Sequence, residues 1–542
     1  TVLDGKPLQY PQKLGIKTAD VGGNADIKVN FKFPLYGALA LQDVKVGAKA
    51  KRNEVMLKDV VKGYPLSGGP MNVSLENNTL KVSGDGYLGT MPLTFEWLRH
   101  FAAGADVVTK VAAKLPLNAE AMAKFGAPED TKAAGTLPAS VTYTEMKDNT
   151  ATLMFNGDIT QTGFIVPVAG YEKPAGVPGT LDFFLHFKDG KPDAVSGLNL
   201  AADKASLKGD VNFGTDIRGE MFAKKMHFSE VKLGDTDIAL SGDNNSSGEY
   251  TIKVTGRQLD ISKFLEGSDK PNSNEDAAKP VRPLTLSVAI DRLVTGKDKS
   301  INQIRMYMRR NGWSRIEQLD VDGICGEKPI TVHYTPVPKG HTLKFEADNA
   351  GAALSALGIT NGVRGGKIAL SGLPDAGGKR NLRGSVSLTD FTLVNVPVLG
   401  RLLNAMSLGG VFELLNGKGI AFKKMRSDFW WIDKGQPDSF ENTRIIKIKE
   451  GQTSGASLGL TFAGIIDQWT NKLDINGTII PVSDLNKLLA NIPLVGTILT
   501  GGGKSVFAAT YAIKGPTDQP TVTVNPLAVL APGILREVFF EK

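Results

Sequence analysis

The sequence predicts a mainly β protein, built as antiparallel sheet with a few amphipathic helices. Two observations carry this prediction. Apolar and polar residues alternate with a period of two along much of the 542-residue chain, and turn-forming residues separate the alternating stretches. The chain also holds 61 glycines and 28 prolines, which suits many strands joined by tight turns.

Two stretches show the alternation most clearly, one near the start of the chain and one in its middle. Lysine, asparagine, threonine, serine and alanine occupy the intervening positions, so each stretch predicts a strand with one apolar face. The apolar positions are Ile27, Val29, Phe31 and Phe33 in the first stretch, and Leu284, Leu286, Val288 and Ile290 in the second.

Helices are expected at few places. Trp97, Phe101, Val108, Val111 and Leu115 predict an amphipathic helix, and a second helix is expected between an N-cap at Asn118 and a stop at Gly126. The expected segments are an N-terminal β segment (1–96), a helical interlude (97–130), a central β segment (131–266), a polar, proline-flanked linker or loop (267–283), another β segment (284–394) and a C-terminal region (395–542).

Composition and motifs favour no catalytic, metal or cofactor site. The net charge of +7 arises from 63 basic and 56 acidic residues, which is typical of a mixed surface, and no nucleic-acid-binding motif is present. The single cysteine, Cys325, excludes an internal disulfide and is expected to be a small buried residue. The run from Gly501 to Ser505 lacks the first glycine of a phosphate-binding loop. We therefore expect a protein that is not an enzyme and has no cofactor.

The C-terminal region carries short apolar segments interrupted by proline and glycine. Residues 395–403 are echoed by residues 491–499, and a third segment follows residue 525. Each is shorter than the ~20 residues of a membrane-spanning helix, so they are expected to be buried plugs or interfacial segments at a membrane-proximal end. The candidate residues are Leu399, Leu402, Leu403, Leu485, Leu488, Leu489, Ile492, Leu494, Ile498, Leu499, Ile534 and Leu535.

The predicted helices are too few to cover the apolar faces of so many strands. A large apolar face exposed to water is unfavourable, so two arrangements remain. One packs sheet on sheet as a sandwich, which the composition slightly favours. The other curls the sheet into a trough whose apolar lining is filled by acyl chains.

Four stretches resemble the C-terminal region of the AsmA-like family of Gram-negative bacteria. They are Ser457–Asp467, Leu473–Pro481, Leu485–Gly496, and the ending from Tyr511 to Arg536. The resemblance extends over roughly Val386 to Phe540, is to the YhdP type in particular, and is more distant to the TamB type.

The resemblance implies an elongated β-sheet curled into a groove, a bridge-like lipid transfer architecture. It further implies a periplasmic protein of the cell envelope that carries phospholipid between the inner and outer membranes. An N-terminal helix outside this chain would anchor it in the inner membrane. A competing hypothesis is a structural or assembly scaffold that aids outer-membrane protein insertion and binds envelope protein partners.

Overall fold

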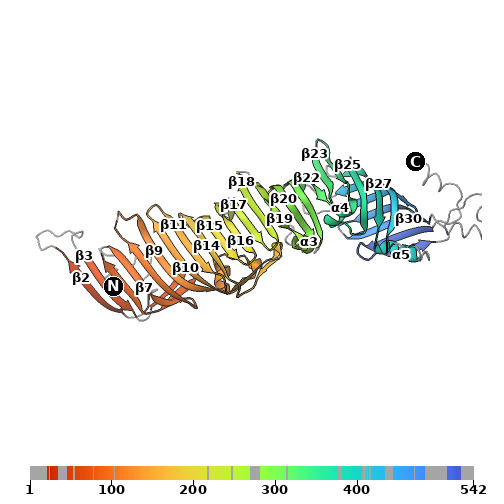
Figure 1. The fold of residues 1–542 in the computed structure, drawn as a ribbon. Helices are drawn as coiled ribbons and strands as arrows, with labels where there is room; N and C mark the ends of the chain where they lie inside the picture. The colour runs from red at the N-terminus through yellow and green to blue at the C-terminus, as the bar shows by residue number, and fades with distance from the viewer. Residues whose placement is uncertain are drawn as a thin grey trace, which may run out of the picture. The chain divides into compact units, whose positions relative to one another are not determined.

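The computed structural model describes residues 21–525, except 23–24, 34–44, 53–54, 77, 103, 217–218, 246–247, 269–280, 313–314, 376–380, 406–410, 412, 414, 416, 434–443, 469 and 482–508. The fold is mainly β, as predicted, and the strands form a curled sheet (Figure 1). The chain divides into two compact units, Thr1–Asp243 and Asn244–Lys542. The predicted linker 267–283 therefore lies inside the second unit.

The first unit is a ladder of antiparallel strands. Its main path of hydrogen-bonded neighbours runs β2, β3, β6, β7, β8, β9, β10, β11, β14, β15, β16, β17 and β18. Two branches leave this path: β1, β4 and β5 join β7, and the β12–β13 hairpin joins β10. The bounds are β1 (Val21–Gly22), β2 (Ala25–Lys32), β3 (Lys45–Arg52), β4 (Val55–Val61), β5 (Tyr64–Gly68), β6 (Met71–Glu76), β7 (Thr79–Leu88), β8 (Met91–His100), β9 (Val107–Asn118), β10 (Ala134–Met146), β11 (Thr150–Asp158), β12 (Thr162–Val166), β13 (Tyr171–Lys173), β14 (Gly179–Lys188), β15 (Lys191–Ala202), β16 (Ala205–Thr215), β17 (Met221–Leu233) and β18 (Thr236–Asn244).

The first helix predicted in the helical interlude is wrong, because its residues lie mainly in strands. Trp97 lies in β8, and Val108, Val111 and Leu115 lie in β9. Strand spacing fits these residues better, because every second residue from Leu93 to Trp97 and from Val111 to Leu117 is apolar and lies on one face of the ladder. The second predicted helix is confirmed as α2 (Ala119–Phe125). The side chain of Asn118 accepts a hydrogen bond from the backbone N–H of Ala121, and Gly126 ends the helix with φ 115°.

The second unit is a ladder in which strands follow one another in chain order from β19 to β32. Every pair is antiparallel except β19–β20. The bounds are β19 (Tyr250–Asp260), β20 (Leu284–Gly296), β21 (Lys299–Arg310), β22 (Ile316–Cys325), β23 (Lys328–Val337), β24 (Gly340–Ala347), β25 (Val363–Pro374), β26 (Leu382–Leu393), β27 (Ile420–Asp433), β28 (Arg444–Gly455), β29 (Leu458–Asp467), β30 (Lys472–Pro481), β31 (Ala509–Pro516) and β32 (Thr521–Asn525).

The parallel pair departs from the all-antiparallel prediction. Parallel neighbours need a connection of a dozen or more residues, because the chain must return to the same end of the sheet. The segment between β19 and β20, which contains α3 (Ser262–Ser268) and the predicted polar linker, supplies this length.

Two further helices show that the second unit is curled. The helix α4 (Ala350–Ala356) packs on β25 and also contacts β21, although the two strands are four ladder positions apart. Four positions span ~19 Å in a flat sheet, whereas seven helical residues span ~10 Å. The sheet therefore bends around α4. Similarly, α5 (Pro397–Ala405), which lies between β26 and β27 in sequence, contacts β32 at the end of the ladder.

Candidate functional site: an apolar inner face

Strand register in the second unit places apolar side chains in continuous rows across the ladder. Residues paired on neighbouring strands share a face, so a row follows from the pairings alone. We call the face that carries these rows the inner face and the opposite one the outer face. One inner row consists of Val254, Val288, Met306, Val321, Val332, Phe345, Leu370 and Val386, and a second of Ile252, Leu286, Met308, Leu319, Tyr334 and Leu343.

Burial along these rows is incomplete. Val254, Val288 and Phe345 are buried, whereas Met306 and Val332 between them are half-buried. All six members of the second row are half-buried as well. The inner face therefore keeps apolar surface that the protein's own side chains do not cover, and such surface can hold an apolar ligand.

The outer face of the same strands is polar. Its central row consists of Ser287, Tyr307, Asp320, His333, Lys344 and Ser371. The carboxylate of Asp320 accepts hydrogen bonds from His333 Nδ1 (2.9 Å) and Gln318 Nε2 (2.8 Å). Burial raises the pKa of Asp320, but these hydrogen bonds outweigh it and leave that pKa below its usual value. Its hydrogen bonds and its partial exposure are typical of a solvated surface carboxylate.

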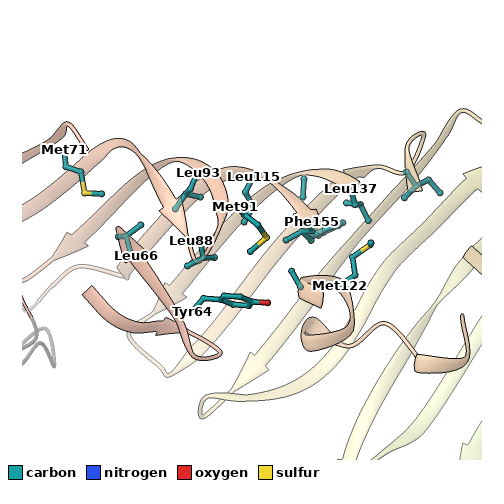
Figure 2. Close-up of a cluster of buried hydrophobic side chains, with 14 residues drawn as sticks. Tyr64, Leu66, Met71, Leu88, Met91, Leu93, Leu115, Met122, Leu137 and Phe155 are labelled. Carbon is teal, nitrogen blue, oxygen red and sulfur yellow. The ribbon is translucent and has the colours of Figure 1, made fainter. Parts of the chain in front are cut away.

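The first unit repeats this division into an apolar and a polar face. Figure 2 shows the buried cluster on its inner face, which draws on β5 to β11 and on α2. The rings of Phe155 and Phe183 stack at 4.8 Å within it. One inner row runs through Trp97, Val111, Tyr143, Leu153, Leu185, Val195, Val211 and Met226, and a deeper one through Leu115, Ala139, Gly157, Leu181, Leu200, Leu207, Val231 and Ile238.

The end of the inner face near α2 is closed by protein. Ala121 and Met122 of α2 are buried in the cluster. Beside them, the buried ammonium of Lys173 donates to the carbonyl oxygens of Ile159 (2.7 Å) and Thr162 (3.0 Å). Burial lowers the pKa of Lys173, and the nearby carboxylate of Asp158 partly offsets this shift. Lys173 at the end of β13 thus fixes the turn between β11 and β12.

The N-terminal groove candidates fall on the inner face of the first unit. Pairing continues the row of Trp97 through Val82, Val73 and Ala50 to Ile27. The exposed fractions are 58% for Ile27, 46% for Val29, 57% for Phe31 and 47% for Phe33. These four large apolar side chains are therefore far more exposed to solvent than those of the buried cluster in Figure 2.

The central groove candidates fall on the inner face of the second unit. Val288 and Ile290 are 7% and 2% exposed, whereas Leu284 and Leu286 are half-buried. Val288 and Ile290 thus belong to the packed floor of the inner face, and Leu286 belongs to its accessible part.

Among the membrane-end candidates, those on α5 are buried within the protein. Leu399, Leu402 and Leu403 are 6%, 2% and 0% exposed, so packing accounts for the apolar stripe of this helix. The other candidates, Leu485, Leu488, Leu489, Ile492, Leu494, Ile498, Leu499, Ile534 and Leu535, lie outside the described residues.

One polar feature of the inner face was missed from the sequence. Arg99, Thr109 and Glu145 are paired across β8, β9 and β10 at the end of the strands farthest from α2. Arg99 Nη1 lies 3.0 Å from Glu145 Oε2 and also donates to the hydroxyl of Thr109. Arg99 follows Trp97 by two residues, and this spacing would have placed it on the same face had the segment been interpreted as a strand.

The described residues show neither a metal centre nor a membrane-spanning helix. They contain no group of three or more histidine, cysteine or acidic side chains placed to hold a metal ion. Within the same part of the chain, none of the helices has the length and hydropathy needed to cross a membrane. A shallow hollow of about 830 Å³ lies over β7 to β14 and is lined mainly by outer-face residues, including Asp85, Lys114 and Asp182.

Comparison with known proteins returned no matching family model and no match among curated proteins.

Proposed function

We propose that this protein binds phospholipid through its acyl chains on the inner face and moves it between the inner and outer membranes. The observation that carries the proposal is the continuity of the apolar rows across successive strands in each unit. A continuous row offers a passing acyl chain the same apolar environment at each strand.

The half-buried side chains of the rows favour a bound apolar ligand over a core filled by the protein's own side chains. Apolar surface gains about 25 cal/mol for each Å² removed from water, and an acyl chain laid on Met306, Val332 and Leu343 would remove such surface. A scaffold stabilised by its own core would bury these side chains completely. We therefore favour lipid binding over the scaffold function, in which the protein would aid outer-membrane protein insertion.

The proposed location is the periplasm, with an anchor in the inner membrane. The support for it is the resemblance of Ser457–Asp467 and Leu473–Pro481 to the AsmA-like C-terminal region. The proposed partners are phospholipid, the two membranes and envelope proteins, and the proposed activity is transport without catalysis.

Site-specific photo-crosslinking tests the proposal, because neighbouring residues on one strand face opposite ways. Crosslinkers at Val29 and Met306 lie on the inner face, and matched crosslinkers at Lys28 and Tyr307 lie on the outer face. We expect lipid adducts, identified by mass spectrometry, at the inner positions alone.

Equal labelling of both faces would contradict the proposal. Adducts to protein at the inner positions, with no lipid, would instead support the scaffold function. Lipid that co-purifies with the unmodified chain provides an independent measurement of the same property.

A further inference from the structure

We propose that Arg99, Thr109 and Glu145 form a headgroup site for a phospholipid that carries a primary ammonium group, such as phosphatidylethanolamine. This inference deepens the proposed function and rests on it. Its structural basis is a gradient of polarity along strands β8, β9 and β10, which runs from a charged end to an apolar end.

The gradient is visible in the order of the cross-strand rows. Arg99, Thr109 and Glu145 form the first row, and Trp97, Val111 and Tyr143 form the second. Two apolar rows follow, Phe95, Ala113 and Val141, and then Leu93, Leu115 and Ala139. The rows thus pass from charged to amphipathic aromatic to apolar side chains. Groups follow the same order from the surface of a bilayer into its interior.

The apolar part is long enough to hold an acyl chain. From Trp97 to Met91 the strand rises ~20 Å at ~3.4 Å per residue. One leaflet contributes ~15 Å to the hydrocarbon thickness of a bilayer. A lipid lying parallel to the strands would therefore place its tails over Phe95 and Leu93 and its headgroup at Arg99.

The charged row retains unused capacity for hydrogen bonds. Arg99 uses Nη1 for both of its bonds, and within the described residues no partner is assigned to its Nε or Nη2. Glu145 accepts through Oε2, and within the same residues no hydrogen bond is assigned to its Oε1. A phosphate can accept from the free edge of the guanidinium, and an ammonium can donate to the free carboxylate oxygen.

The position of the pair is suited to a headgroup. The side chains of Arg99 and Glu145 are 26% and 34% exposed, so they lie at the border between the apolar face and water. Burial and the Glu145 carboxylate raise the pKa of the neighbouring Tyr143, and Arg99 opposes this shift. The next strands carry Ala151 and Phe187 at the same level, so the charged row is bounded by apolar residues on that side.

The test compares the lipids captured by the full-length chain from vesicles with equal amounts of phosphatidylethanolamine and phosphatidylglycerol. Both lipids carry a phosphate, but only the first carries an ammonium. Bound lipid, measured by mass spectrometry, should be enriched about threefold in phosphatidylethanolamine, the size expected of one partly exposed charge contact. Glu145→Gln should abolish this enrichment while total bound lipid stays constant, and Arg99→Gln should lower the binding of both lipids.

Glu96→Gln is the matched control. Glu96 pairs with Lys81 at 2.6 Å, lies three residues from Arg99 on β8 and belongs to the outer face, so this variant should keep the enrichment. Lipid captured in the vesicle ratio by the wild type, or enrichment retained in Glu145→Gln, would overturn the headgroup site while leaving lipid binding in place. Absence of any bound lipid in the wild type would overturn the proposed function itself.

A measurement on the wild type alone tests the site without depending on whether the variants fold. Phosphatidylcholine carries a trimethylated nitrogen that has no N–H to donate to Glu145. From vesicles with equal amounts of the two lipids, we expect phosphatidylethanolamine to be captured in preference to phosphatidylcholine, and equal capture would count against the site.

Discussion

Arg315 and Asp433 face each other within the second unit, with Arg315 Nη1 4.0 Å from Asp433 Oδ2 and side chains that are 2% and 8% exposed. Arg315 immediately precedes β22, and Asp433 ends β27. Five ladder steps separate these strands, which is ~24 Å in a flat sheet. The buried ion pair therefore exists because the sheet curls, and it joins the two sides of that curl.

Replacing Arg315 with Met should destabilise the second unit. The change leaves the buried carboxylate of Asp433 without its cationic partner, and a broken buried pair costs about 3 kcal/mol. Urea unfolding measures the loss. Lys81→Met breaks an exposed pair and should change the free energy of unfolding by less than about 1 kcal/mol. Equal effects of the two variants would show that the Arg315 pair does not hold the curl.

Cys325 should be nearly inert to thiol reagents in the folded protein. It is 1% exposed, and burial raises its pKa from 9.0 to about 11. At pH 8 the reactive thiolate is then about 100-fold scarcer than for a thiol at its ordinary pKa. Labelling rates followed by absorbance should rise with pH up to about 11 and should rise sharply on unfolding. Rapid labelling of the native protein at pH 8 would contradict this burial.

The capping residue of α4 should control how often that helix opens. Asn349 accepts a hydrogen bond from the backbone N–H of Ala352, and its amide donates to the carbonyl of Gly326, which directly follows Cys325. Asn349→Ala should destabilise the helix by about 1 kcal/mol and raise the Cys325 labelling rate about fivefold. Ser355→Ala, on the same helix, leaves the cap intact and serves as the control. An unchanged labelling rate in Asn349→Ala would show that α4 does not protect Cys325 from the reagent.

Leu403→Asp should unfold the region around α5. Leu403 is 0% exposed, and an unpaired charge at a buried position costs several kcal/mol. Thermal melts followed by circular dichroism should show a large drop in the melting temperature for Leu403→Asp. The melting temperature of Arg401→Asp should change little, because Arg401 is exposed. A Leu403→Asp protein that stays folded but no longer floats with liposomes would instead assign this helix to a membrane surface.

A tyrosine near the end of the second ladder depends on a glycine beneath it. Tyr511 donates to the carbonyl of Thr461 at 2.7 Å and passes over Gly477, where an added Cβ would lie 2.6 Å from the hydroxyl oxygen and would overlap the Thr461 carbonyl oxygen. Gly477→Ala should cost about 2 kcal/mol through this overlap, and Tyr511→Phe about 1 kcal/mol through the lost hydrogen bond. Chemical denaturation measures both, with the exposed Thr510→Ala as control. A smaller loss in Gly477→Ala than in Tyr511→Phe would contradict this packing.

Alternation in the sequence was enough to predict strands, and it predicted that Ile27 and Val29 share one face of their strand and that Val288 and Ile290 share one face of theirs. It failed between Trp97 and Leu115, because apolar residues on both faces of β8 and β9 also match helical spacing. The parallel pairing of β19 with β20 was likewise hidden, since alternation determines the face of a residue and not the direction of its neighbour. Contacts between distant segments, such as those of Arg99 with Glu145 and of Arg315 with Asp433, depend on register and curl, which no local pattern contains.

On the proposed function, the inner rows also bear on how fast a bound acyl chain could travel. Leu286, Met308 and Leu319 are half-buried apolar side chains of similar size at successive ladder positions, so an acyl chain that moves by one strand exchanges one set of contacts for a nearly equal set. Movement over sites of similar affinity meets low barriers, for the same reason that ions pass quickly through channels with several matched sites. Uniformity of the rows thus favours diffusion along the sheet, and a single deep pocket would oppose it.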